Sequence, residues 1–201
     1  LSHYVWTATA AGLGPLAGVQ VSADTVAVIC RGRTTPQIFS YGTMAANDQV
    51  MFACRYCGNS AADGCIAGDV EATANGTSLG LAPGDTFSTT PTSGTIVHET
   101  ALGGRVNGTF QELRQWSTLR TKAELATFAL CAISPGTSGL AHYWGLVDAF
   151  SGSLTAGTTV TDSVGGDDGT SAGVNVGAWT ASLFGACAGG PTVTPTPVAT
   201  A

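Results

Sequence analysis

The chain has 201 residues, of which 44% are hydrophobic, only 10% are charged and 28 are glycine. Its formal net charge is −6 and its seven basic residues are scattered, which excludes the basic surface that nucleic-acid binding needs. The apolar share excludes a disordered chain. No apolar run approaches the roughly 20 residues of a membrane-spanning helix. The composition therefore predicts a folded protein with no nucleic-acid partner and no membrane span.

Most of the chain consists of short segments rich in β-forming residues, which Gly, Pro, Asn and Asp separate. The candidate strands are 4–9, 19–21, 25–30, 37–41, 49–54, 95–100, 105–110, 140–147, 158–161 and 174–184. Turn residues recur about every 8–15 positions, a spacing typical of sandwiches and jelly rolls. We expect an all-β fold, an antiparallel β-sandwich or jelly-roll-like domain that disulfides stabilise.

One stretch, 110–133, contains no glycine or proline and holds most of the good helix formers. Thr121 and Glu124 have the spacing of a capping box, in which each side chain accepts a hydrogen bond from the other residue's backbone amide. Apolar residues then recur at helical spacing at Leu125, Phe128, Ala129 and Ala132. The sequence favours one short helix near 121–133, with a strand over 127–133 as the alternative.

The six cysteines predict disulfides and hence an oxidising compartment outside the cytosol. They are Cys30, Cys54, Cys57, Cys65, Cys131 and Cys187. Spacing suggests a local staple between Cys57 and Cys65, a clip between Cys30 and Cys54, and a tie between Cys131 and Cys187, but sequence alone leaves the pairing open. A zinc site built on Cys54, Cys57 and Cys65 is the weaker alternative, because a second closely spaced pair is missing.

Further features fit an extracellular protein. Asn75 and Asn107 each begin an Asn-Gly-Thr sequon and are candidate glycosylation sites. The start at Leu1 lacks a leader pattern, so we expect a mature secreted form. Residues 189–201 are rich in Pro and Thr, which predicts an extended tail or linker after a single β-sandwich domain at 1–188.

No set of residues predicts catalysis or a resident metal. His98-Glu99 begins an H-E-x-x-H pattern, but Leu102 occupies the position of the second histidine. No G-x-S-x-G motif is present. Asp162, Asp167 and Asp168 lie in a glycine-rich loop, which would suit a weak calcium site or a plain polar turn. We therefore expect no cofactor, with calcium as the one weak alternative.

Adjacent aromatic residues offer a binding hypothesis. Tyr143 and Trp144 lie on a candidate strand and should face opposite sides of it. One of them would then be free to stack on a sugar ring while the other packs in the core. Core and edge packing alone is the competing interpretation of both residues.

Together these patterns predict a non-catalytic extracellular structural subunit that self-assembles into a filament, pilus or surface layer. The low charge favours burial of the outer surface against sister copies, through β-strand or apolar contacts. Residues 1–21 are a candidate exchanged N-terminal strand. Glycans are the other expected partners. The alternatives are a carbohydrate-binding module or lectin, and a secreted hydrolase whose site assembles only in three dimensions.

Overall fold

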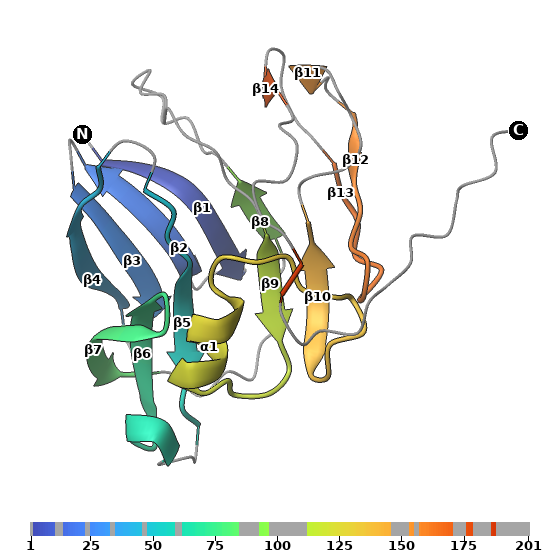
Figure 1. The fold of residues 1–201 in the computed structure, drawn as a ribbon. Helices are drawn as coiled ribbons and strands as arrows, with labels where there is room; N and C mark the ends of the chain where they lie inside the picture. The colour runs from blue at the N-terminus through green and yellow to red at the C-terminus, as the bar shows by residue number, and fades with distance from the viewer. Residues whose placement is uncertain are drawn as a thin grey trace, which may run out of the picture. The chain divides into compact units, whose positions relative to one another are not determined.

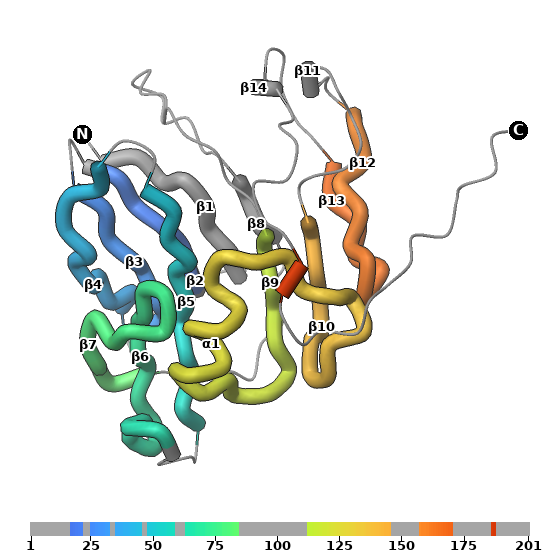
Figure 2. The backbone as a smooth tube through the Cα atoms, in the orientation of Figure 1, coloured from blue at the N-terminus to red at the C-terminus, as the bar shows by residue number. Residues whose placement is uncertain are grey.

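The computed structural model describes residues 2–10, 14–22, 25–32, 35–45, 48–58, 62–84, 93–96, 112–145, 153–154, 157–170, 176–178 and 186–187 (Figure 1). Figure 2 draws the backbone as a tube in the same orientation. The chain divides into two compact units. Unit 1 comprises 1–108 and 119–130, and unit 2 comprises 109–118 and 131–201. The tail expected at 189–201 lies outside the described residues, and the single domain expected at 1–188 stays a prediction.

Unit 1 begins with a five-stranded antiparallel sheet in the order β4-β3-β2-β1-β8 (Figure 1). The strands are β1 (Ser2–Ala10), β2 (Gly14–Ser22), β3 (Thr25–Arg31), β4 (Pro36–Thr43) and β8 (Ser93–Ile96). The first four follow one another as neighbours because short connections join adjacent antiparallel strands.

The N-terminal segment pairs within its own chain. β1 hydrogen-bonds to β2 on one side and to β8 on the other, so both of its edges have partners. A strand exchanged into another subunit would leave those positions to a neighbour's strand. Here β2 and β8 fill those positions, and strand exchange by residues 1–21 stays a prediction.

A second sheet of unit 1 packs against the first. It contains β5 (Phe52–Tyr56), β6 (Asp69–Ala74) and β7 (Thr77–Pro83) in the order β5-β6-β7. The two sheets share a buried apolar cluster of Val28, Cys30, Phe39, Val70 and Ala72. A disulfide between Cys30 and Cys54 links β3 to β5 beside this cluster.

The helix predicted near 121–133 is present as α1 (Lys122–Phe128), and its capping box is confirmed. Thr121 Oγ1 accepts the amide N–H of Glu124 over 3.1 Å, and Glu124 Oε2 accepts the amide N–H of Thr121 over 2.8 Å. Leu125 is the buried residue of the helix. The alternative strand over 127–133 is wrong, because residues up to Phe128 are helical.

Unit 2 consists of short antiparallel pairs. β9 (Leu113–Trp116) pairs with β10 (Leu140–Trp144), β11 (Ser153–Leu154) with β14 (Val176–Ala178), and β12 (Thr159–Val160) with β13 (Gly169–Thr170). A disulfide between Cys131 and Cys187 ties the segment after α1 to residues near the C-terminus. The described chain is thus mainly antiparallel β-sheet with one short α-helix and three disulfides, as the sequence predicts.

None of the helices in the described ranges has the length and apolar character needed to span a membrane.

Candidate functional site

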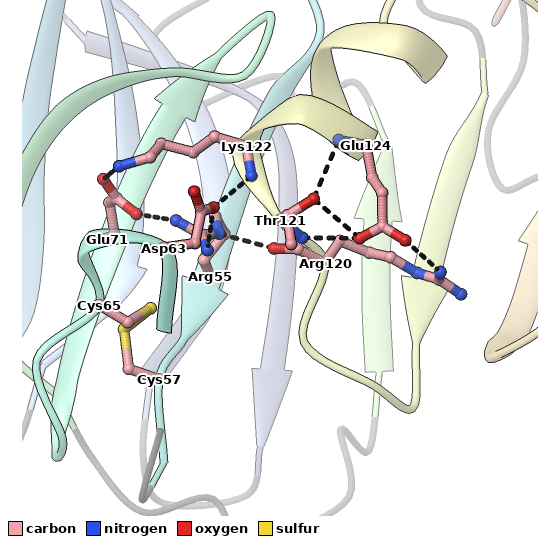
Figure 3. A network of polar contacts seen from close by, with 9 residues as sticks. All are labelled: Arg55, Cys57, Asp63, Cys65, Glu71, Arg120, Thr121, Lys122 and Glu124. Carbon is pink, nitrogen blue, oxygen red and sulfur yellow. Dashed lines mark hydrogen bonds and ion pairs between the residues drawn. A yellow bond between two sulfur atoms is a disulfide. The ribbon is translucent and has the colours of Figure 1, made fainter. Parts of the chain in front are cut away.

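Unit 1 contains a network of charges centred on Arg55 (Figure 3). Arg55 and Glu71 lie directly opposite each other on β5 and β6, and both side chains are buried. Arg55 Nη1 donates to Glu71 Oε2, Nη2 donates to Asp63 Oδ2 over 2.9 Å, and Nε donates to the carbonyl of Arg120 over 2.8 Å. One guanidinium therefore connects two strands, a loop and the segment before α1.

Asp63 lies in a short loop that a disulfide closes. Cys57 and Cys65 are bonded on either side of it, and the backbone of Asp63 is left-handed, with φ 56°. A short cross-linked loop holds such a conformation more easily than an open one, since less chain entropy opposes it. The same Asp63 carboxylate accepts the amide N–H of Lys122 at the start of α1.

Lys122 completes the connection between α1 and the second sheet. Its Nζ lies 3.5 Å from Oε1 of Glu71 (Figure 3). The turn between β6 and β7 lies close to the helix. A Cβ added at Gly76 in this turn would lie only 2.3 Å from the carbonyl oxygen of Lys122. The network thus holds α1 against β6 and against the loop at Asp63, and its contacts are those of a group that stabilises the fold.

Unit 2 contains a second set of buried polar groups, on one face of β10. Tyr143 is buried and its hydroxyl donates to Glu112 Oε1 over 2.7 Å. Arg114 Nη2 donates to Glu112 Oε2 over 3.1 Å and to the carbonyl of Cys131 over 2.6 Å. Burial raises the pKa of Glu112 above its ordinary value, although the bonds from Tyr143 and Arg114 oppose the shift.

The opposite face of β10 carries His142, which is fixed by Asp162. Nδ1 of His142 lies 2.7 Å from Asp162 Oδ2. The Asp162 carboxylate also accepts four backbone amides, from Tyr143, Val164, Gly165 and Asp167, over 2.9–3.2 Å. Burial alone would raise the pKa of Asp162, but these hydrogen bonds hold it far below its usual range.

Trp144 lies on the same face as His142, two residues along the strand. The two rings are stacked, with centroids 5.4 Å apart and planes inclined by 8°. The indole Nε1 donates to the carbonyl of Asp167 over 3.1 Å. Tyr143 and Trp144 therefore face opposite sides of β10, with Tyr143 buried and Trp144 half-buried, and the stacking of either ring on a sugar stays a prediction.

Hydrogen bonds already occupy the carboxylates of two of the predicted calcium residues, Asp162 and Asp168. Asp168 Oδ1 accepts the backbone amide of Asp162 over 2.8 Å, while both oxygens of Asp162 accept N–H groups. N–H dipoles aimed at a carboxylate repel a cation, which Ca²⁺ binding would have to overcome. Within the described ranges, no group of His, Cys, Asp and Glu is arranged to hold a metal ion.

The candidate sequon at Asn75 lies in the turn between β6 and β7, where Asn75 Oδ1 accepts the amide N–H of Met51 over 2.8 Å. Asn107, His98 and Glu99 lie outside the described residues. The cysteines expected as disulfides pair in the three ways that their spacing suggested.

Two sets of interacting residues could not be predicted from the sequence: the Arg55 network and the His142–Asp162 pair. Arg55 and Glu71 are 16 residues apart and His142 and Asp162 are 20 apart, so each pair meets only through the fold. The sequence does carry one local signal, since Asp162 followed by Ser-Val-Gly has the form of an Asx turn.

Comparisons of this chain with protein-family models, with curated proteins and with solved structures find no match.

Proposed function

We propose that this protein is an extracellular, non-catalytic structural subunit that associates with copies of itself through the edges of its sheets. Three disulfides fit an oxidising location. The assembly would be a filament, a pilus or a surface layer. The proposal differs from strand exchange in that each copy keeps β1 in its own sheet.

The observation that carries the proposal is where the basic residues lie. Each of the five in the described part of the chain is buried or paired with a neighbouring carboxylate: Arg31, Arg55, Arg114, Arg120 and Lys122. Monomeric β-proteins commonly place lysine on exposed edge strands, where its charge prevents pairing with another chain. These five cations are buried or paired, and none of them lies on β4 or β7.

The edge strands themselves support edge-to-edge association. β4 and β7 contain no charged residue, and each has a single neighbouring strand among the described residues. Ile38 in β4 is a large apolar side chain with 64% of its surface exposed. We propose that β4 pairs with β4 of a second copy, which would satisfy the free backbone groups and cover Ile38.

Light scattering on the full chain, with electron microscopy of concentrated samples, tests this proposal. We expect the average mass to rise with concentration and Ile38→Lys to return the protein to monomer, because two β4 strands would then bring like charges together. Ile66→Lys is the matched control. Ile66 is similarly exposed, at 57%, but lies outside the strands, so its replacement should leave association unchanged.

The proposal fails if the wild-type chain stays monomeric at every concentration. Equal loss of association in both lysine variants would also contradict it, since the effect would then follow net charge rather than the β4 edge.

Glycosylation at Asn75 and Asn107 belongs to the same proposal. Glycans would keep uncharged parts of the surface solvated. They would also restrict the faces through which copies of the chain can associate. Mass spectrometry of the protein from its native secretion route, before and after enzymatic deglycosylation, tests both sequons. Unmodified asparagine at both positions would remove glycans from the proposal without affecting self-association.

A further inference from the structure

His142 on β10 is held more firmly than a surface histidine needs to be. Asp162, which accepts its Nδ1 contact, is itself fixed by four backbone amides. Trp144 stacks on the imidazole, and a Cβ added at Gly165 would lie 2.1 Å from Nδ1. The ring is therefore held at one face by Trp144 and at its Nδ1 edge by the loop at 162–168.

This arrangement decides which nitrogen of His142 is available. An ionised carboxylate only accepts hydrogen bonds, so Nδ1 carries the hydrogen that points to Asp162. In the neutral imidazole Nε2 then bears the lone pair. The side chain of His142 is 20% exposed, and among the described residues no hydrogen bond occupies Nε2. In its neutral form His142 thus offers a fixed acceptor beside an aromatic surface.

The surrounding charges define what that acceptor would bind. Asp167 adds a carboxylate that is 76% exposed and lies 3.7 Å from His142 Nδ1. Within the described ranges no arginine or lysine pairs with Asp162, Asp167 or Asp168, so nothing here would neutralise an anionic ligand. The site combines hydrogen-bond acceptors with an indole ring, and its ligand should combine hydroxyl donors with an apolar face.

We propose that His142, Trp144 and Asp167 form a binding site for a neutral saccharide. The apolar face of a sugar ring packs on Trp144, while hydroxyl groups donate to His142 Nε2 and to the Asp167 carboxylate. The site does not depend on self-association, because it is built from unit 2 alone whereas β4 belongs to unit 1.

The test is an NMR titration of the ¹⁵N-labelled full chain with three neutral hexasaccharides, built from glucose, mannose and N-acetylglucosamine. Concentrations up to about 10 mM reach weak, millimolar affinities. We expect at least one sugar to shift the Trp144 indole N–H and the amides of 163–168 saturably. The same titration on Ile38→Lys keeps self-association from obscuring the result.

Variants separate the sugar contact from simple disruption. Trp144→Ala should weaken binding by about tenfold or more, as expected for an aromatic anchor that the bound sugar covers. Trp144→Phe should keep part of the affinity, and His142→Gln should lower it several-fold. Ile66→Ser, in unit 1, should leave it unchanged. If Trp144→Ala unfolds, the Phe and Gln variants still decide the question.

Three results would overturn the proposal. They are no shift with any of the sugars, shifts that fall outside β10 and the loop at 162–168, and saturation by choline or CaCl₂ in the absence of a sugar response. The last result would assign the site to a cation.

Discussion

Arg55 and Glu71 form an ion pair in which both side chains are almost completely withdrawn from water. Taking two charges out of water is costly, and their attraction offsets that cost only when further hydrogen bonds complete the geometry. Asp63 and the carbonyl of Arg120 accept such hydrogen bonds from Arg55, and Lys122 adds an ion-pair contact to Glu71 at 3.5 Å. The pair is thus the centre of the contacts between α1 and the second sheet. Its loss should lower the stability of unit 1 as a whole.

The first prediction is that Glu71→Gln strongly destabilises the protein. Glutamine keeps the shape of Glu71 but removes its charge, so the buried guanidinium of Arg55 is left with Asp63 as its one carboxylate partner among the described residues. Breaking a buried pair in this way typically costs about 3–5 kcal/mol of unfolding free energy. Urea denaturation followed by far-UV circular dichroism measures the change.

Glu124→Gln is the matched control for Glu71→Gln. Glu124 pairs with Arg120 at the surface of α1, and glutamine preserves the capping box. Because the Glu124 side chain is 41% exposed, water screens this pair, and its loss should cost no more than about 1 kcal/mol. Similar losses in the two variants would show that burial of the Arg55–Glu71 pair has no special role.

The second prediction concerns the start of α1. Thr121→Ala removes the side chain that caps the helix, which should cost about 1 kcal/mol, whereas Thr121→Ser keeps a hydroxyl and should cost much less. Because α1 has only seven residues, it depends on this cap and on its packing more than a long helix would. Equal stability of the Ala and Ser variants would contradict the role of the cap.

Local patterns explain what the sequence could predict. The capping box needs only Thr121 and Glu124, three residues apart, so it is readable without the fold. The opposite orientations of Tyr143 and Trp144 follow from the two-residue period of a strand. The pairing of Cys57 with Cys65 follows from their short separation.

The remaining features depend on contacts between distant segments. Arg55 faces Glu71 only because β5 and β6 pair in one register, and a shift by one residue would turn the two side chains to opposite faces. His142 meets Asp162 through the return of the chain after β12. The second neighbour of β1 in its sheet is β8, which follows some 90 residues later in the chain, and periodicity does not reveal a contact at that separation.

The third prediction concerns Asp162 and Glu112, two carboxyl groups of unit 2. The contribution of each to the free energy of unfolding should change with pH in the opposite direction. Asp162 has a pKa lowered by folding, so its unfolded form binds a proton first as pH falls. Its contribution is complete above the ordinary value of about 3.9 and is lost as pH falls towards the folded pKa.

Glu112 behaves in the opposite sense. Its pKa is raised by burial, so the folded form keeps a proton longer as pH rises. Stability should therefore fall between the ordinary pKa of 4.5 and the higher folded value, and then level off. Carboxyl ¹³C shifts followed through the titration assign each step, with Glu112 titrating above its ordinary value and Asp162 below. Titration of either group on the other side of its ordinary value would contradict the structure.

The fourth prediction is that Gly165→Ala disturbs His142 without strain in the backbone. A Cβ at this position would lie 2.1 Å from His142 Nδ1 and 2.7 Å from Asp162 Oδ2, so one of the two must move. We expect a loss of about 1–3 kcal/mol of stability, as for other overpacked sites, and a large change in the His142 ring ¹⁵N shifts. Gly169→Ala is the control, because its Cβ would meet Val160 at an ordinary 3.7 Å. Unchanged His142 signals in Gly165→Ala would mean that the loop at 162–168 does not hold the imidazole in place, and the fixed Nε2 acceptor would be lost with it.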